Sequence, residues 1–235
     1  MLILKTKVFI HSFLLLIFIA RQYFFHALFS LHKSKSQLRQ DIFALSMTNF
    51  KKSGFFVEFG ATDGIYLSNT FLLEKKFNWT GILSEPAKSW HGRLDNNRIS
   101  LVDKRCIWKK TGDFLEFNEA QDPALSTVQA FNDFDVHAHS RAKNNKYLVE
   151  TITLEDLLDF HNAPLNIDLL SIDTEGSEYE ILKSFDFSKY TFRVICCEHN
   201  YNENREKIYS LLSRNGYQRV YTFFSRFDDW YIKCN

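Results

Sequence analysis

The chain has 235 residues, of which 45% are hydrophobic and 24% are charged, values typical of one globular domain of moderate size. Its formal net charge of +1 provides no basic field, so nucleic acid is excluded as an expected partner. The four cysteines include no C-x-x-C pair, which argues against a disulfide framework and against a structural zinc site. We therefore predict that the cysteines are reduced thiols in the core.

The N-terminal segment contains an apolar run, Val8 to Ala20, that is shorter than the ~20 residues of a membrane-spanning helix. Residues 8–31 could still associate with a membrane, and the basic residues that follow the run would then favour a domain on the cytoplasmic side. Alternatively, the segment is a helix packed on the domain. The chain divides into residues 1–35, a hydrophobic segment with a linker, and residues 36–235, one domain that is cytoplasmic or held at the membrane.

Predicted strands and helices alternate along the domain. This alternation indicates an α/β fold with helices on both faces of a mostly parallel sheet. An antiparallel pair at 219–224 and 230–234 adds an antiparallel edge, as in a seven-stranded sheet of this class, and a hairpin is expected at 110–113. Residues 122–146 lack periodicity and are interpreted as a lid over a binding site. Strands are predicted at 54–59, 81–84, 100–102, 148–153, 167–172 and 192–198, and helices at 36–52, 67–77, 87–97, 154–160, 179–187 and 202–215.

The first predicted strand runs directly into a turn that holds two of the chain's 8 glycines, Gly60 and Gly64. Glycines at a strand exit let backbone amides approach a ligand without a Cβ in the way. Glu58, beside this turn, suits a ligand that carries an amino group or ribose hydroxyls. The spacing differs from the G-x-G-x-x-G of dinucleotide-binding enzymes, so a nicotinamide-dependent oxidoreductase is not expected.

Ligands of open α/β sheets bind beyond the carboxyl ends of the strands, so polar residues at these ends are candidate site residues. Glu85 follows the second strand and is placed to accept hydrogen bonds from two ribose hydroxyls. After the third strand, Asp103 or Cys106 could flank an adenine ring.

Acidic residues also follow the strands at 167–172 and 192–198. Asp173 and Glu198 are expected at neighbouring strand ends that face one crevice, together with His199. His199 or Asp173 would be the general base, with carboxylates orienting the histidine. Alternatively, the three residues could bind a divalent ion that lowers the pKa of a bound substrate hydroxyl. The catalytic candidates are thus His199, Asp173 and Glu198.

Four blocks of sequence together resemble the FkbM family of S-adenosylmethionine-dependent methyltransferases. They are residues 54–64 (GFFVEFGATDG), 67–70 (LSNT), 79–83 (WTGIL) and 168–178 (DLLSIDTEGSE). The resemblance implies a class I, Rossmann-like fold and S-adenosylmethionine as the cofactor. It assigns cofactor binding to Glu58, Gly60, Ala61, Asp63, Gly64, Asn69, Glu85, Asp173 and Glu175.

The same resemblance implies methyl transfer, usually to a hydroxyl of a sugar, a glycan or lipid, or a small natural product. The expected partner is thus a small-molecule or glycan acceptor, whose identity the residues do not indicate. A protein of another class, a membrane-anchored interaction protein that uses the fold without catalysis, is the alternative.

Overall fold

The computed structural model describes residues 24–121, 124, 126–129 and 144–234. The strands of the main sheet are β1 (Phe55–Phe59), β2 (Thr80–Ser84), β3 (Leu101–Asp103), β8 (Asn166–Ile172), β9 (Thr191–Glu198), β10 (Tyr217–Val220) and β11 (Asp228–Lys233). A smaller sheet contains β4 (Cys106–Ile107), β5 (Phe114–Ala120), β6 (Thr127–Val128) and β7 (Asn144–Ile152). The helices are α2 (Phe24–Leu31), α3 (Gln40–Met47), α4 (Phe71–Phe77), α5 (Lys88–Asn97), α6 (Leu154–Phe160), α7 (Glu178–Lys183), α8 (Asn204–Arg214) and α9 (Thr222–Ser225).

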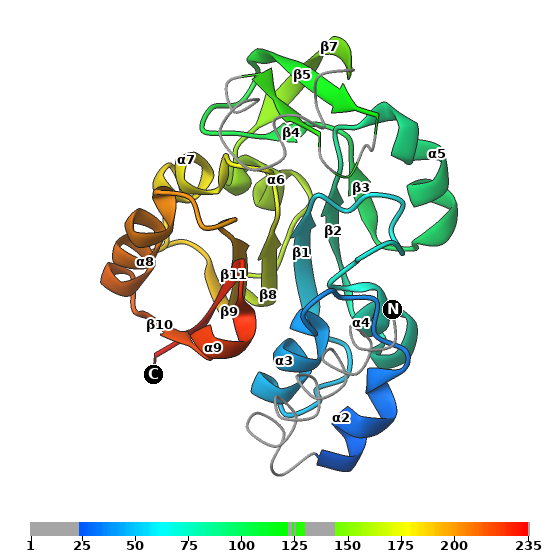
Figure 1. Ribbon diagram of the computed structural model, residues 1–235, viewed down its shortest axis with the longest axis vertical. Helices are drawn as coiled ribbons and strands as arrows, with labels where there is room; N and C mark the ends of the chain where they lie inside the picture. The colour runs from blue at the N-terminus through cyan, green and yellow to red at the C-terminus, as the bar shows by residue number, and fades with distance from the viewer. Residues whose placement is uncertain (1–23, 122–123, 125, 130–143, 235) are drawn as a thin grey trace.

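The main sheet has seven strands in the order β10-β11-β9-β8-β1-β2-β3. Every pairing is parallel except those of β11, which lies antiparallel to both β9 and β10. Helices cover both faces of this sheet (Figure 1). The predicted α/β, Rossmann-like fold, with a mostly parallel seven-stranded sheet and an antiparallel C-terminal pair, is therefore confirmed.

Successive residues of the central strands pack on opposite faces of the sheet, as the pleat of a strand requires. Val57 of β1 belongs to the core that includes α6, α7 and α8, whereas Phe56 belongs to the core that includes α3 and α4. Cys196 and Cys197 of β9 divide between the two cores in the same way. All four cysteines are free thiols, as predicted, but only Cys106, Cys196 and Cys197 are buried, and Cys234 is exposed.

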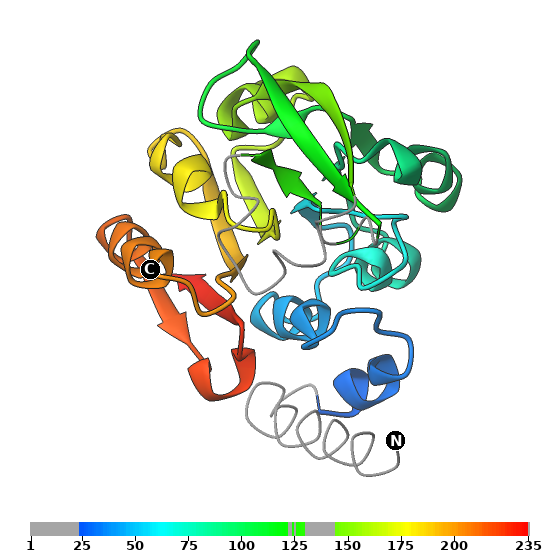
Figure 2. The ribbon, with the colours of Figure 1, turned by 45° about the horizontal axis from the view of Figure 1, so that its top comes forward.

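The smaller sheet, in the order β4-β7-β5-β6, lies beyond the carboxyl ends of the central strands (Figures 1 and 2). The predicted hairpin at 110–113 is wrong, because β4 and β5 do not pair with each other. Both pair with β7 instead, β4 in parallel and β5 antiparallel. The pairing with β5 also explains why β7 begins at Asn144, earlier than the strand predicted at 148–153.

Helix α2 packs on the domain, since Ala27 is fully buried in the core that contains α3. The ring of His26 lies 5.8 Å from that of Phe50. Residues 8–23 of the proposed membrane segment lie outside the described residues. Within the part of the chain that the structure describes, no helix has the length and hydrophobicity needed to cross a bilayer. Membrane association and the boundary at residue 36 stay predictions.

Candidate active site

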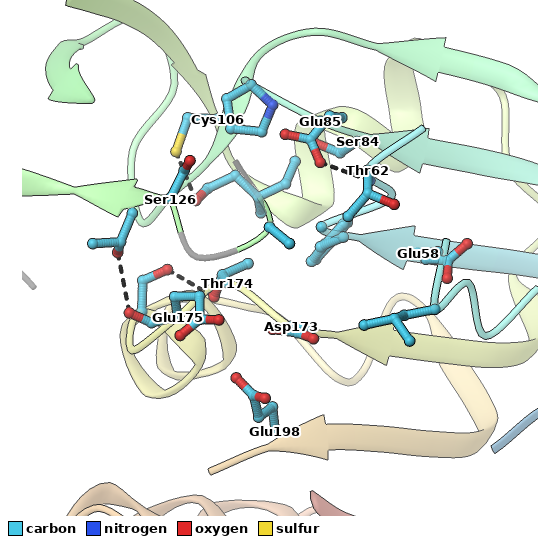
Figure 3. Close-up of a pocket in the computed structure, with 18 of the residues that line it drawn as sticks. Glu58, Thr62, Ser84, Glu85, Cys106, Ser126, Asp173, Thr174, Glu175 and Glu198 are labelled. Atoms are coloured by element: carbon cyan, nitrogen blue, oxygen red, sulfur yellow. Dashed lines mark hydrogen bonds between the residues drawn. The ribbon is translucent and has the colours of Figure 1, made fainter. Parts of the chain in front are cut away.

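A cavity of about 610 Å³ lies at the carboxyl ends of β1, β2, β8 and β9, with residues of β5 and β6 on its other side. This volume is in the range of small-molecule sites. Strand-end residues line it, as expected for an open α/β sheet. Asp173, Glu175 and Glu198 lie on one side of the cavity, and Glu85 lies on the opposite side (Figure 3).

Gly60 forms the turn between the two sides of the cavity. Its φ of 72° is in the left-handed region, where a glycine avoids strain. A Cβ at this position would lie 2.2 Å from the carbonyl oxygen of Asp173. The glycine is therefore needed because the β1 turn presses against the loop that follows β8.

Three of the predicted cofactor-binding residues, Ala61, Asp63 and Gly64, do not line the cavity. The Asp63 carboxylate accepts hydrogen bonds from the amides of Ile65 and Tyr66, at 2.9 and 2.7 Å. Ala61 is buried in the core that contains α3 and α4. A Cβ at Gly64 would lie 2.5 Å from Cγ of Arg98. The three residues shape the turn and its packing, and their contact with a ligand stays a prediction.

Glu58 lines the cavity, but its carboxylate is occupied by the loop before α4. It accepts hydrogen bonds from the Asn69 amide at 2.6 Å and from the hydroxyls of Ser68 and Thr70. The guanidinium of Arg98 lies 3.6 Å away. These contacts also explain why the helix predicted at 67–77 begins only at Phe71.

The Glu85 carboxylate is held at the cavity wall by two backbone amides. Oε2 accepts from the amide of Thr62 and Oε1 from that of Ala87, both at 2.8 Å (Figure 3). Burial raises the pKa of Glu85 to about 7, although these two hydrogen bonds lower it. Since a carboxylate has about four lone-pair sites, further lone pairs remain available for ribose hydroxyls.

Of the two residues proposed to flank an adenine ring, only Cys106 lines the cavity. Burial raises the pKa of its thiol to about 12, so the thiol stays neutral. Asp103 instead accepts hydrogen bonds from Arg105 and contacts the His161 ring at 3.0 Å. It supports the chain beside the cavity.

Asp173, Glu175 and Glu198 have carboxylate oxygens within 4.8 Å of one another. Burial raises the pKa of Asp173 to about 6 and that of Glu198 well above its usual range, and the neighbouring carboxylates add to the rise at Glu198. Hydrogen bonding between the two side chains lowers the pKa of Asp173 and raises that of Glu198. The expectation that these strand ends meet is confirmed. An all-oxygen set of this kind could also bind a hard divalent cation.

His199, predicted as a general base or a metal ligand, lies outside the cavity and outside the cluster of Asp173, Glu175 and Glu198. Its Nδ1 accepts a hydrogen bond from the Tyr201 amide at 2.9 Å, and its Nε2 lies 3.7 Å from the Asp229 carboxylate. Burial lowers the pKa of His199 to about 4, so the ring is neutral. Glu198 reaches the cavity and the next side chain does not, because successive side chains of an extended segment point to opposite sides.

Two further acidic residues after 167 have structural roles. Asp168 forms an ion pair with Lys51 at 2.8 Å and accepts the Phe55 amide at 2.9 Å, which fixes the start of β1. Glu178 accepts hydrogen bonds from the amides of Thr174 and Gly176 and so closes the loop before α7. Neither lines the cavity.

Asn69 lines the cavity as expected and donates a hydrogen bond to Ser171 Oγ at 2.9 Å. The described part of the predicted lid also reaches the cavity, and Thr127 donates to the carbonyl of Glu175 at 3.1 Å. Residues 130–143 of the lid lie outside the described residues. The sequence did not indicate several further residues that line the cavity. They include Gln37, Tyr66, Thr174, Asn200, Tyr201 and Phe227.

The sheet order and the cavity at the strand ends define an open α/β protein of the Rossmann-like class with a ligand site at the strand ends. A family profile described as the methyltransferase FkbM domain matches residues 58–226. The chain therefore belongs to the FkbM methyltransferase family.

Two solved structures are similar to the chain. Precorrin-6y C5,15-methyltransferase from Geobacter metallireducens GS-15 is 12% identical, with a TM-score of 0.40, over 77% of this chain and 71% of that one. Methyltransferase FkbM from Methylobacillus flagellatus KT is 16% identical, with a TM-score of 0.46, over 78% of this chain and 44% of that one. A comparison with curated proteins finds no match.

Proposed function

We propose that the protein transfers a methyl group from S-adenosylmethionine to a hydroxyl of a sugar, a glycan or lipid, or a small natural product. The observation that carries the proposal is the cavity itself. It joins a buried carboxylate, Glu85, to a second acidic centre, Asp173 and Glu198, on two further strand ends.

Three described features fit the cofactor. Glu85 is fixed by backbone amides and can accept the ribose hydroxyls, with Cys106 beside the adenine. Gly60 brings the β1 turn against the β8 loop without a side chain in the way. Asn69 and Gln37 offer amide groups at the cavity wall for the amino-acid portion of the cofactor.

The cofactor supplies a methyl group on a sulfonium sulfur, and the protein has to align the acceptor and remove its proton. Asp173 and Glu198 are the base in this proposal, because a carboxyl pair with raised pKa values is a better proton acceptor at neutral pH than an ordinary aspartate. Alignment of the acceptor oxygen with the methyl group contributes much of the rate enhancement.

The aromatic rings at the cavity support an acceptor with both polar and apolar surface. Tyr66 and Tyr201 line the cavity and are 50% and 69% exposed, so they lie at its mouth. Phe117 and Phe227 contribute apolar wall. The tyrosine hydroxyls can form hydrogen bonds and the aromatic rings can stack, so the acceptor in this proposal is a hydroxylated ring compound rather than a purely apolar one.

Calorimetric titration with S-adenosylmethionine tests cofactor binding, and transfer of labelled methyl groups into glycan and lipid extracts tests the reaction. We expect binding that Glu85→Ala weakens by about 10-fold or more, through loss of charge-assisted hydrogen bonds. Lys88→Ala, which removes a side chain from the adjoining helix outside the cavity, is the control. Absence of binding by the folded wild-type protein would contradict the proposal and favour the non-catalytic alternative.

A further inference from the structure

The wall of the cavity carries acidic side chains without basic ones among the described residues. Among the described residues that line it are carboxylates but no lysine, arginine or histidine. One of these carboxylates, Glu58, is paired with Arg98 outside the cavity. Asp173 and Glu198 belong to no ion pair among the described residues, so their charge is directed toward whatever occupies the space.

Asp173 and Glu198 are the centre of this charge, because no described lysine, arginine or histidine forms an ion pair with either. The charged side chains that shift their pKa values most are themselves carboxylates: Glu58 of β1, Glu175 of the β8–α7 loop and Glu178 of α7. Asp228 of β11 also interacts electrostatically with Asp173.

The strand order places this charge relative to the proposed ribose site. Glu85 follows β2 and Asp173 follows β8, with β1 between these strands. Neighbouring strands lie about 4.8 Å apart, so the two strand ends are separated by about 10 Å. This separation is comparable with the length of a ribose together with the group attached to its 5′ carbon. A nucleoside whose ribose is at Glu85 would therefore direct its 5′ substituent over Gly60 toward Asp173.

We propose that the Asp173–Glu198 pair makes the cavity selective for a positively charged methyl donor over the uncharged product. This inference rests on the proposed function. In the reaction the bond between sulfur and the methyl carbon breaks and a bond between that carbon and the acceptor oxygen forms. The hydroxyl proton passes to the carboxyl pair, and the sulfonium becomes a neutral thioether. Attraction between the pair and the sulfur is thus lost when the product forms, which promotes its release.

The test is calorimetric titration of the full chain with three probes, in buffer that contains a chelator. S-adenosylmethionine has a positive sulfonium, S-adenosylhomocysteine has a neutral sulfur, and sinefungin has an amine-bearing carbon in place of the sulfonium. We expect the two cationic probes to bind at least about 10-fold more tightly than S-adenosylhomocysteine, since a charge pair at close range readily contributes that factor.

Variants separate charge from shape. In Asp173→Asn or Glu198→Gln alone, the remaining carboxylate keeps one negative charge, so the preference should persist. The double variant removes it, and we expect all three probes to bind within about 3-fold of one another, with S-adenosylhomocysteine affinity unchanged. Glu116→Gln removes one charge at an exposed position outside the cavity and should change nothing.

Equal affinities in the wild-type protein, or a preference that survives in the double variant, would overturn the inference. Failure of all three probes to bind the folded protein would instead overturn the proposed function. The two failures are distinguishable because S-adenosylhomocysteine binding depends on the cofactor site and not on the charge of the sulfur.

Discussion

The guanidinium of Arg98 lies 3.6 Å from the carboxylate of Glu58, and both side chains are almost completely buried. The same arginine lies 3.1 Å from Glu74 and donates hydrogen bonds to the Gly64 carbonyl and the Thr70 hydroxyl. It therefore joins the end of β1, the following loop and α4. The cavity wall that Glu58 forms depends on a residue 40 positions further along the chain (98 − 58).

Arg98→Leu should lower the free energy of unfolding by about 3–5 kcal/mol, because it leaves two buried carboxylates without their partner. Lys104→Leu is the control, since its ion pair with Asp95 is half exposed and should contribute at most about 1 kcal/mol. Denaturant unfolding of the two variants measures both values. Similar losses in the two variants would show that the buried network does not stabilise the loop.

Gly64 and Gly112 have the same φ of 81°, but only Gly64 is enclosed. Gly112→Ala should cost about 1–2 kcal/mol of left-handed strain. Gly64→Ala should cost about 1–3 kcal/mol more, because its Cβ would meet Arg98. Thermal or denaturant unfolding measures the difference in stability between the two variants. Equal losses of unfolding free energy would mean that the Arg98 side chain moves away from the new Cβ without an energetic cost.

His199→Asn should retain activity within about 3-fold, because the ring lies outside the cavity and the asparagine oxygen can accept the Tyr201 amide as Nδ1 does. The double variant Asp173→Asn, Glu198→Gln should lower kcat by about 100-fold or more, since it removes both carboxylates of the proposed base. Both are compared with the wild-type protein in the labelled-methyl assay. A larger loss in the histidine variant would restore His199 as the candidate base.

Asp228 makes stability depend on pH. Burial raises its pKa from 3.8 to about 8, while the hydrogen bonds from Trp230 and Gln40 lower it. A carboxyl whose pKa is raised in the folded state binds its proton more tightly there, so its contribution to stability decreases as pH rises from about 4 to about 8.

Asp228→Asn should therefore stabilise the protein by on the order of 1–2 kcal/mol at pH 8.5 and by much less at pH 5. Urea unfolding at the two pH values measures the gain. Asp95→Asn, at a half-exposed position, is the control and should show no comparable pH dependence. A gain of the same size at both pH values would show that ionisation of Asp228 is not the cause.

Activity should persist in excess chelator, because the raised pKa values of Asp173 and Glu198 favour protonation, which relieves their repulsion without a cation. The measurement is methyl transfer before and after dialysis against chelator, followed by addition of magnesium. Loss of activity that magnesium restores would show that the three carboxylates bind a divalent ion.

Local signals predicted much of the fold. Helix α6 has the predicted bounds, 154–160, and the Thr153 side chain accepts the Asp156 amide at its start. The sequence also predicted the alternating strands and the carboxylates at their carboxyl ends. The pleat determines which face of the sheet a side chain is on, and the parallel strand direction brings the carboxyl ends to one edge. Asp173, Glu198 and Glu85 accordingly reach the cavity.

The errors concern contacts between distant parts of the chain. The hairpin at 110–113 is absent because β7 pairs with both β4 and β5, which local turn residues do not reveal. Gly64 is required by Arg98 rather than by a ligand. His199 is adjacent to the cavity residue Glu198 in sequence, but the alternation of side chains directs it to the other side.

Strand β11 lies between β9 and β10, although it follows β10 along the chain. During synthesis a ribosome therefore releases β10 before the strand that connects it to the rest of the sheet. Until β11 inserts, β10 has no described strand neighbour, and the adjoining edge of β9 is unpaired and able to associate with other chains. Stalled or truncated nascent chains should thus be retained by chaperones until residues 228–233 emerge.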